Sequence, residues 1–325
     1  MLIGALCYRW LLPLAPVLPW LIFFMLFFTF CKVNPLDLRL HRWHWVVLAI
    51  QLFCAITVYY TLIFFTGNPV LSQGLMLCFI MPTATAAPII AGKLGGSIQN
   101  LTTFTLLSNF ATSLVVPAFF PIVNPAADMT FWSAFLLILS RIAPLLLGPF
   151  FSAWALRAGY DWYQKKRINP STSSTPKTFI LPTRLAVIPF YLWVASIIVL
   201  TAVVTETVVH TLHSSLFTII WLLIGAFLAC LFQFGVGKLI GYQLPAPSKG
   251  RDYQDVLVNP AAAPTTMAGV SSITAGQAFG QKNTSLGVWM ANTYLDPLAS
   301  LGAAAYIIWQ NIFNSLQLFI AAHKK

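Results

Sequence analysis

The residue whose type and position most suggest chemistry is Lys282, in the polar stretch GQAFGQKNTSLG at 276–287. This stretch interrupts an apolar segment at 265–294, which places the lysine inside an expected membrane span. A charge at that depth costs about 2.5–3.5 kcal/mol on insertion scales and marks a functional residue by default. Two roles fit: a fixed cation that supports broken helix ends and attracts an anion, or a group that loses and regains a proton. A lysine that only extends to one membrane face is the alternative without such a role.

A second polar stretch, MPTATAAPIIAGKLGG at 81–96, interrupts another apolar segment and contains Pro82 and Pro88. Paired interruptions in two halves of a membrane chain indicate a transporter binding site. The N-termini of the resulting half-helices carry free N–H groups and positive dipole ends, which suit carboxylates or sulfonates. The candidate substrate residues at these starts are Thr83, Thr85 and Ala86 in the first stretch and Asn283, Thr284 and Ser285 in the second. Simple proline kinks and hydrogen bonds between packed helices are the alternatives.

The elements that position these residues are expected to be membrane helices. Of the 325 residues 58% are hydrophobic and only 8% are charged, against roughly 25% charged in a soluble domain. Since only helices or closed barrels span lipid, apolar runs of this length predict an all-α polytopic protein. About nine spans are expected, at 13–31, 45–66, 73–92, 98–123, 131–156, 185–209, 216–242, 265–294 and 297–322.

The net charge of +11 is explained by topology. Basic residues collect on alternate loops, which the positive-inside rule assigns to the cytoplasm, so nucleic acid is not an expected partner. With about nine spans the N-terminus is expected outside and the C-terminus inside. The Ser-, Thr- and Pro-containing segment 159–183 is expected to be a cytoplasmic linker between two halves. The pattern suits a eukaryotic plasma membrane or a bacterial inner membrane, and the compact chain favours the bacterial one.

Several classes of function are disfavoured by what the chain contains. Its five cysteines form no C-x-x-C pair, and its seven acidic residues include no pair within an expected span. No H-E-x-x-H or similar motif is present, so we expect neither an enzyme nor a metal or cofactor site. A cation/proton antiporter would need an acidic residue in the membrane, and the second polar stretch has none.

The order and spacing of four motifs carry a resemblance to a known family. VLPWLIFFMLFFTFCKVNPLDLRL, MPTATAAP, FGQKNTSLG and IIWQNI resemble the second helix, the two helix breaks and the Trp-His-Asn motif of the bile acid:sodium symporter family. The resemblance covers most of the chain, from Pro19 onwards. It implies secondary transport of an organic anion by a core domain with two crossed, broken helices, arranged as inverted repeats, and a panel domain. The panel would hold the helices at 13–31, 131–156 and 185–209, and the core the other six.

The resemblance also implies roles for particular residues. Thr85 and Asn283 would line the substrate cavity, and Gln310 with Asn311 would stand where the family's His-Asn pair contacts substrate. Sodium ligands of the family are replaced by Ala87, Pro88, Ala278 and Lys282, although Thr105 keeps a hydroxyl.

Sodium prefers several oxygen ligands, so a site that exchanges a carboxylate for an ammonium is not expected to bind it. We therefore expect no sodium coupling in the family's manner. A conventional sodium symporter, a proton-coupled carrier and a non-transporting receptor remain the alternatives.

Overall fold

The computed structural model describes residues 2–31, 38–125, 129–167, 188–246 and 266–323. Within these ranges the regular secondary structure is helical, apart from one isolated β-bridge between Thr83 and Lys282. The elements are α1 (Leu2–Leu6), α2 (Tyr8–Leu11), η1 (Leu12–Val17), α3 (Leu18–Phe30), α4 (Arg42–Thr66), α5 (Pro69–Ile80), α6 (Ala87–Lys93), α7 (Ile98–Val123), α8 (Phe131–Arg167), α10 (Ile188–Gln243), α12 (Met267–Gly280), α13 (Thr284–Tyr294), η4 (Pro297–Ala299) and α14 (Ser300–His323).

Six stretches of the described helices are long and apolar enough to cross a membrane. They are Tyr8–Phe30, Arg42–Thr66, Ile98–Val123, Phe131–Gln164, Ile188–His210 and Leu216–Gln243. The chain therefore has the architecture of an all-α membrane protein, as its composition predicts. The other three expected spans, 73–92, 265–294 and 297–322, fall on the two interrupted helix pairs and on α14, which carries Gln310, Asn311 and Asn314.

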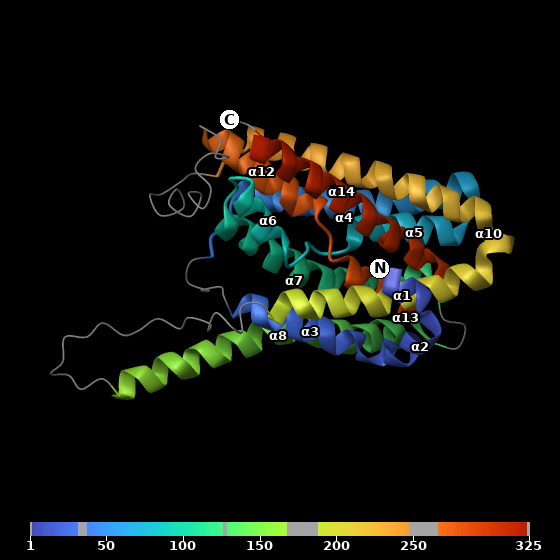
Figure 1. Ribbon diagram of the computed structural model, residues 1–325, viewed down its shortest axis with the longest axis horizontal. Helices are drawn as coiled ribbons and strands as arrows, with labels where there is room; N and C mark the ends of the chain where they lie inside the picture. Colours follow the sequence, from blue (N-terminus) through green and yellow to red (C-terminus); the bar gives the residue numbers. More distant parts are fainter. Residues whose placement is uncertain (1, 32–37, 126–128, 168–187, 247–265, 324–325) are drawn as a thin grey trace.

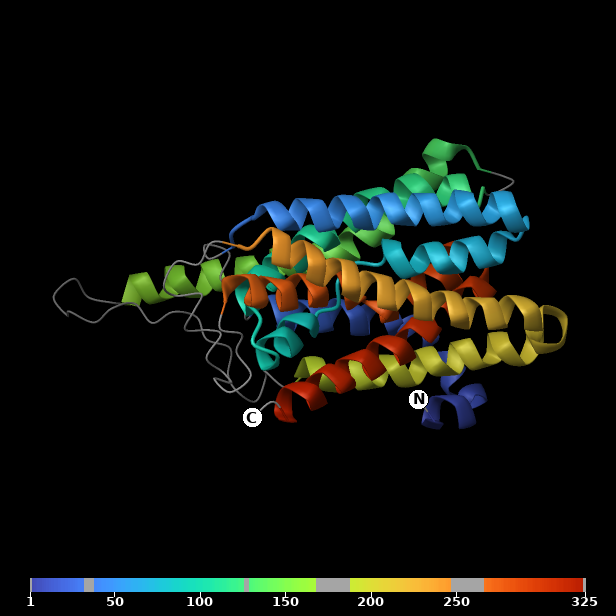
Figure 2. The same cartoon turned by 90° about the horizontal axis from the view of Figure 1, so that it is seen from above.

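Two helices differ in extent from the expected elements. α8 continues to Arg167, so the first residues of the expected linker at 159–183 are helical, and the rest lie outside the described residues. α10 contains two of the six spans, and its ribbon turns back on itself between them (Figures 1 and 2). The two spans thus form a helical hairpin within one helix of 56 residues.

The helices form two groups that pack along one another. α3 packs against α8 and α10, and Figure 1 shows these helices, with the first part of α10, along one side of the molecule. The second part of α10 runs beside α12 and α14 on the other side, together with α4 and α5 (Figure 1). The interior holds large side chains such as Trp43, Tyr306 and Phe279, and it also encloses Lys282.

Local sequence explains both interruptions. α5 ends at Ile80 because Pro82 has no N–H to continue the helix, and Pro88 occupies the first turn of α6, where proline is favoured. α12 ends at Gly280, and α13 restarts after Asn283, whose side chain caps it.

Close helix contact beside the breaks depends on glycine. A Cβ on Gly302 of α14 would overlap the backbone of Gly74 of α5, so these two helices touch through their main chains.

Candidate functional site

The two helix breaks meet at the centre of the molecule. Thr83 pairs with Lys282 in an antiparallel β-bridge. On one side of the pair the Ala84 N–H donates to the Gln281 carbonyl at 3.0 Å, and on the other the Asn283 N–H donates to the Pro82 carbonyl at 2.8 Å. We call the paired segments 81–86 and 281–283 the crossing. The bridge satisfies backbone groups that a broken helix would otherwise leave unpaired in the membrane.

The two bridge partners also cap each other's helices. A helix end leaves its last carbonyls without partners from the same helix. The hydroxyl of Thr83 donates to the Ala278 carbonyl at the end of α12, at 2.7 Å. Lys282 Nζ donates to the Phe79 carbonyl at the end of α5, at 3.2 Å. Each break therefore supplies the group that closes the opposite half-helix.

The other carbonyls at the end of α5 are closed by amide and hydroxyl side chains from three further helices. Gln233 Nε2 of α10 donates to the Cys78 carbonyl at 3.1 Å. Thr112 Oγ1 of α7 donates to the Ile80 carbonyl at 3.3 Å, and Gln51 Nε2 of α4 donates to the Met81 carbonyl at 3.2 Å. Together with Lys282, these donors satisfy four consecutive carbonyls, 78–81. The end of α5 is thus tied to α4, α7, α10 and the second break.

The second break is held mainly by α14. Tyr306 donates its hydroxyl to the Gly280 carbonyl at 2.9 Å. Gln310 accepts from the Lys282 N–H at 3.0 Å, and its Nε2 lies 3.4 Å from the Lys282 carbonyl. Gln310, one of the predicted substrate residues, therefore holds the backbone of Lys282 in place.

The Lys282 side chain is enclosed by protein, with 1% of its surface exposed. Its Nζ lies 5.1 Å from the centroid of the Phe279 ring, within the range of a cation–π interaction. In the described part of the chain the ammonium has no carboxylate partner. Its electrostatic support comes from a carbonyl at the negative end of the α5 dipole and from an aromatic face.

The predicted substrate residues of the first break occupy three different settings. Thr83 lies within the bridge, three residues before the N-cap of α6, and so it does not begin a half-helix. Thr85 is nearly buried at 8% exposure, and Ala86 is the exposed N-cap of α6. The first N–H groups of α6 bond to nearby carbonyls, because Ala87 donates to Ala84 and Ile89 donates to Ala86. This helix start therefore offers fewer free donors than the sequence suggested.

The start of α13 agrees with the expected boundary. Asn283 Oδ1 accepts from the Leu286 N–H at 3.2 Å, and Thr284 and Ser285 follow in the first turn, both buried. Asn283 Nδ2 is buried and has no hydrogen-bond partner among the described residues. An unpaired buried amide donor is costly, so it marks a position where an acceptor would be favourable.

Neither of the two remaining predicted residues hydrogen-bonds to the bridge in the described part of the chain. Asn311 is exposed on α14, next to the buried Gln310. Thr105 is buried on α7, where its hydroxyl donates to the Leu101 carbonyl at 3.0 Å and its own carbonyl accepts from Asn109. The hydroxyl of Thr105 therefore serves the helix itself.

No protein-family profile matches this chain, and no curated protein matches it. The bile acid:sodium symporter resemblance therefore rests on the sequence motifs alone.

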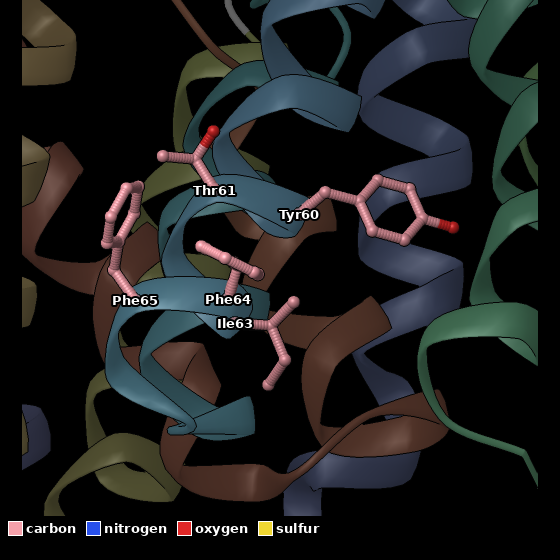
Figure 3. A pocket seen from close by; sticks show the side chains of 5 residues that line it. All are labelled: Tyr60, Thr61, Ile63, Phe64 and Phe65. Carbon is pink, nitrogen blue, oxygen red and sulfur yellow. The ribbon is translucent and has the colours of Figure 1, made fainter.

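Two hollows in the surface do not coincide with the predicted substrate residues. One, of about 550 Å³, is lined by residues of α4 alone. Figure 3 shows that Tyr60 and Phe65 point to opposite sides of that helix, so no convergent polar set forms there. The other, of about 460 Å³, lies between α4, α5 and α10 and is bounded by Thr57, Phe79 and Phe232. It adjoins the crossing through Phe79, whose carbonyl accepts from Lys282.

The sequence did not single out Gln51 and Gln233 as part of the site. The available signal was a lone amide in each of two strongly apolar runs, at 45–66 and 216–242. An amide in such a run needs a partner in the protein, and both of these bond to the end of α5. The whole arrangement is a buried, electropositive junction of broken helices without an acid, which suits binding of an anion more than binding of a cation.

Proposed function

We propose that this protein is a secondary active transporter that carries a small organic anion by alternating access. One observation supports this most: two interrupted helices meet through their breaks in the protein interior, with the Lys282 ammonium at the meeting point. Irregular backbone at membrane depth is tolerated only where protein or a cavity surrounds it, and paired breaks typically form transporter sites. A carrier accounts for the breaks better than an enzyme does, because the site combines amide, hydroxyl and ammonium groups without a nucleophile–base pair.

The proposed architecture has nine spans, a core of six and a panel of three. The contacts of α3 with α8 and α10 support the panel, and the contacts of α12 and α14 with the second part of α10 support the core. The antiparallel pairing of the two breaks supports inverted repeats. The loop charges support an N-terminus outside and a C-terminus in the cytoplasm, in a bacterial inner membrane.

The proposed substrate is a carboxylate, a sulfonate or a bile-acid-like anion. Asn283 Nδ2 offers an unpaired buried donor at the start of α13, next in sequence to Lys282. Thr85, Thr284 and Ser285 would complete the polar surface that the anion meets. In this proposal sodium is not required, because Ala87, Pro88 and Ala278 provide no side-chain oxygen at the replaced ligand positions.

The direct test is uptake by proteoliposomes of a panel of carboxylates and sulfonates, including bile acids. Uptake is measured with sodium or with potassium as the only cation, for the wild type and for Lys282→Ala. Lys93→Ala is the matched control, because Lys93 is an exposed lysine in the last turn of α6. We expect uptake that is equal in both salts, lost in Lys282→Ala and retained in Lys93→Ala.

Three results would each contradict part of this proposal. Uptake that needs sodium in the wild type identifies a conventional sodium symporter and removes the argument from the replaced ligands. Saturable binding of an anion without any uptake identifies a receptor with the fold of a carrier. Acidification of the lumen together with substrate entry would show instead that protons are coupled to transport.

A further inference from the structure

The end of α5 is closed by three neutral donors and one charged donor. Gln51, Thr112 and Gln233 each reach one carbonyl from a different packed helix. Among the described residues, the fourth carbonyl, that of Phe79, accepts only from the long side chain of Lys282, which comes from a break about 200 residues later in the chain. A neutral amide would satisfy the same hydrogen bond, so the presence of an ammonium requires a reason of its own.

A buried lysine is normally unfavourable for stability. Removing a charge from water is expensive, and replacing buried charges with apolar side chains of similar volume is often stabilising. The cost falls where fixed dipoles already favour a positive charge, and the C-terminal end of a helix is such a place. Lys282 Nζ lies at that end of α5 and also near the face of Phe279, so both neighbours favour the charged form.

We propose that the Lys282 ammonium is a tethered cation that caps the C-terminal end of α5, so that the crossing assembles without any bound inorganic ion. Broken membrane helices often coordinate a metal cation with the carbonyls at such an end. Here the side chain occupies that place, because its Nζ donates to the Phe79 carbonyl.

The proposal also predicts a new binding site in a variant. Removal of the Lys282 side chain opens a site for a small monovalent cation at the C-terminal end of α5. The inference deepens the role that Lys282 has in the proposed function, but it concerns assembly of the crossing and is tested without transport.

The first experiment compares thermal unfolding of the purified wild type, Lys282→Met and Lys93→Ala in one detergent. Methionine matches the unbranched apolar stem of lysine to within one atom and removes the charge and the donor. We expect Lys282→Met to lower the unfolding temperature by about 2–4 °C, as loss of a hydrogen bond to a charged group implies for a chain of this length. We expect Lys93→Ala, which removes a lysine from an exposed helix end, to change it by less. A higher unfolding temperature for Lys282→Met than for the wild type overturns the proposal, since it shows that the charge only destabilises.

The second experiment asks whether a free cation replaces the tethered one. Unfolding of Lys282→Ala is followed in sodium, potassium or ammonium chloride against choline chloride at the same ionic strength. We expect at least one of the small cations to recover part of the lost unfolding temperature, with saturation, while the wild type shows no such dependence. Equal unfolding temperatures of Lys282→Ala in all four salts overturn the proposal.

The wild type gives a test that does not depend on any variant folding. A saturable rise of its unfolding temperature in sodium or potassium, but not in choline, would show that the crossing binds an inorganic cation beside Lys282, and the proposal fails. All three experiments measure the unfolding temperature and none measures transport. A protein that passes them and transports no anion leaves the tethered cation intact and removes only the proposed function.

Discussion

The break between α5 and α6 and the break between α12 and α13 lie side by side, yet their helix ends are held in different ways. The first spans Met81–Ala86, and the carbonyls before it are closed by side chains from several helices, one of them charged. The second spans only Gln281–Asn283, and its side-chain donors are the hydroxyls of Thr83 and Tyr306 and the amide of Gln310, all of them neutral. The restart differs as well, because α13 has an Asn283 cap and α6 has no side-chain cap.

The two helix ends before the breaks also differ in whether a charged group closes them. The end of α5 uses a cation, whereas hydroxyl groups and a backbone N–H serve the end of α12. Lys282 belongs to the second break, but its ammonium lies at the end of α5, whereas the positive start of α13 stays on the second break. Under the proposed function, an anionic substrate is expected to contact the second break, where the positive start of α13 and the unpaired Asn283 Nδ2 lie.

The largest effect in a test of this difference is expected from Gly302→Ala. A Cβ at Gly302 would meet the backbone of Gly74, so α14 has to move away from α5. The second break then loses the support of Tyr306 and Gln310, while the first keeps its donors from α4 and α7. We expect a loss of about 3 kcal/mol in the free energy of unfolding, measured by thermal or denaturant unfolding in detergent.

The matched control is Gly235→Ala on α10. A Cβ there would have no heavy atom within 4 Å, and alanine is the better helix former. This variant is expected to be as stable as the wild type or more stable. If both glycine variants behave alike, close contact between α5 and α14 does not support the second break.

A smaller effect is expected from Thr83→Val, which keeps the shape of the side chain and removes its hydroxyl. The Ala278 carbonyl would then remain buried without its donor, at a cost of about 1–3 kcal/mol. Unfolding of this variant and of Lys282→Met, alone and combined, forms a double-mutant cycle. Because the two residues are bridge partners that cap each other's helices, we expect a non-additive result. Strict additivity would mean that the two breaks are closed independently.

The smallest effect is expected at the helix starts. Asn283→Ala removes the N-cap of α13 and should cost about 1 kcal/mol. Ala86→Ser places a capping side chain before α6, but the backbone of Ala86 is helical (φ −81°, ψ −15°) rather than extended, so no gain is expected. Both variants are measured in the same unfolding assay. If Asn283→Ala costs nothing, or if Ala86→Ser clearly stabilises the protein, the two helix starts do not differ in capping as described.

Much of this arrangement could be predicted from the sequence because its signals are local. Pro82, Pro88 and Gly280 stand where the helices break, and Asn283 is a good cap, so the breaks and the start of α13 were predicted within a few residues. The apolar residues around Lys282 predict a position inside a membrane span, which stays a prediction. The structure shows that protein encloses the side chain. The start of α6 was predicted a few residues too early, because Thr83 pairs with Lys282 in place of entering the helix.

The partners of these residues could not be predicted in the same way. Which carbonyl receives the Lys282 ammonium depends on how two segments distant in sequence align, and that register is set by packing of whole helices. The same holds for Gln51 and Gln233, whose sequence positions give no indication that both reach the end of α5. The substrate role of Asn311, the coupling role of Thr105 and the division into core and panel stay predictions.

The covalent attachment of the Lys282 ammonium has a consequence for energetics. A dissociable ion can enter from one side of a membrane and leave on the other, and its concentration difference then drives uphill transport. A cation fixed to the chain returns with it in every cycle, so it transfers no free energy from an ion gradient. For a monovalent anion carried alone, a potential that is negative inside favours exit by about 2.3 kcal/mol per 100 mV. Under the proposed function, the natural direction in such a membrane is export, or exchange of one anion for another.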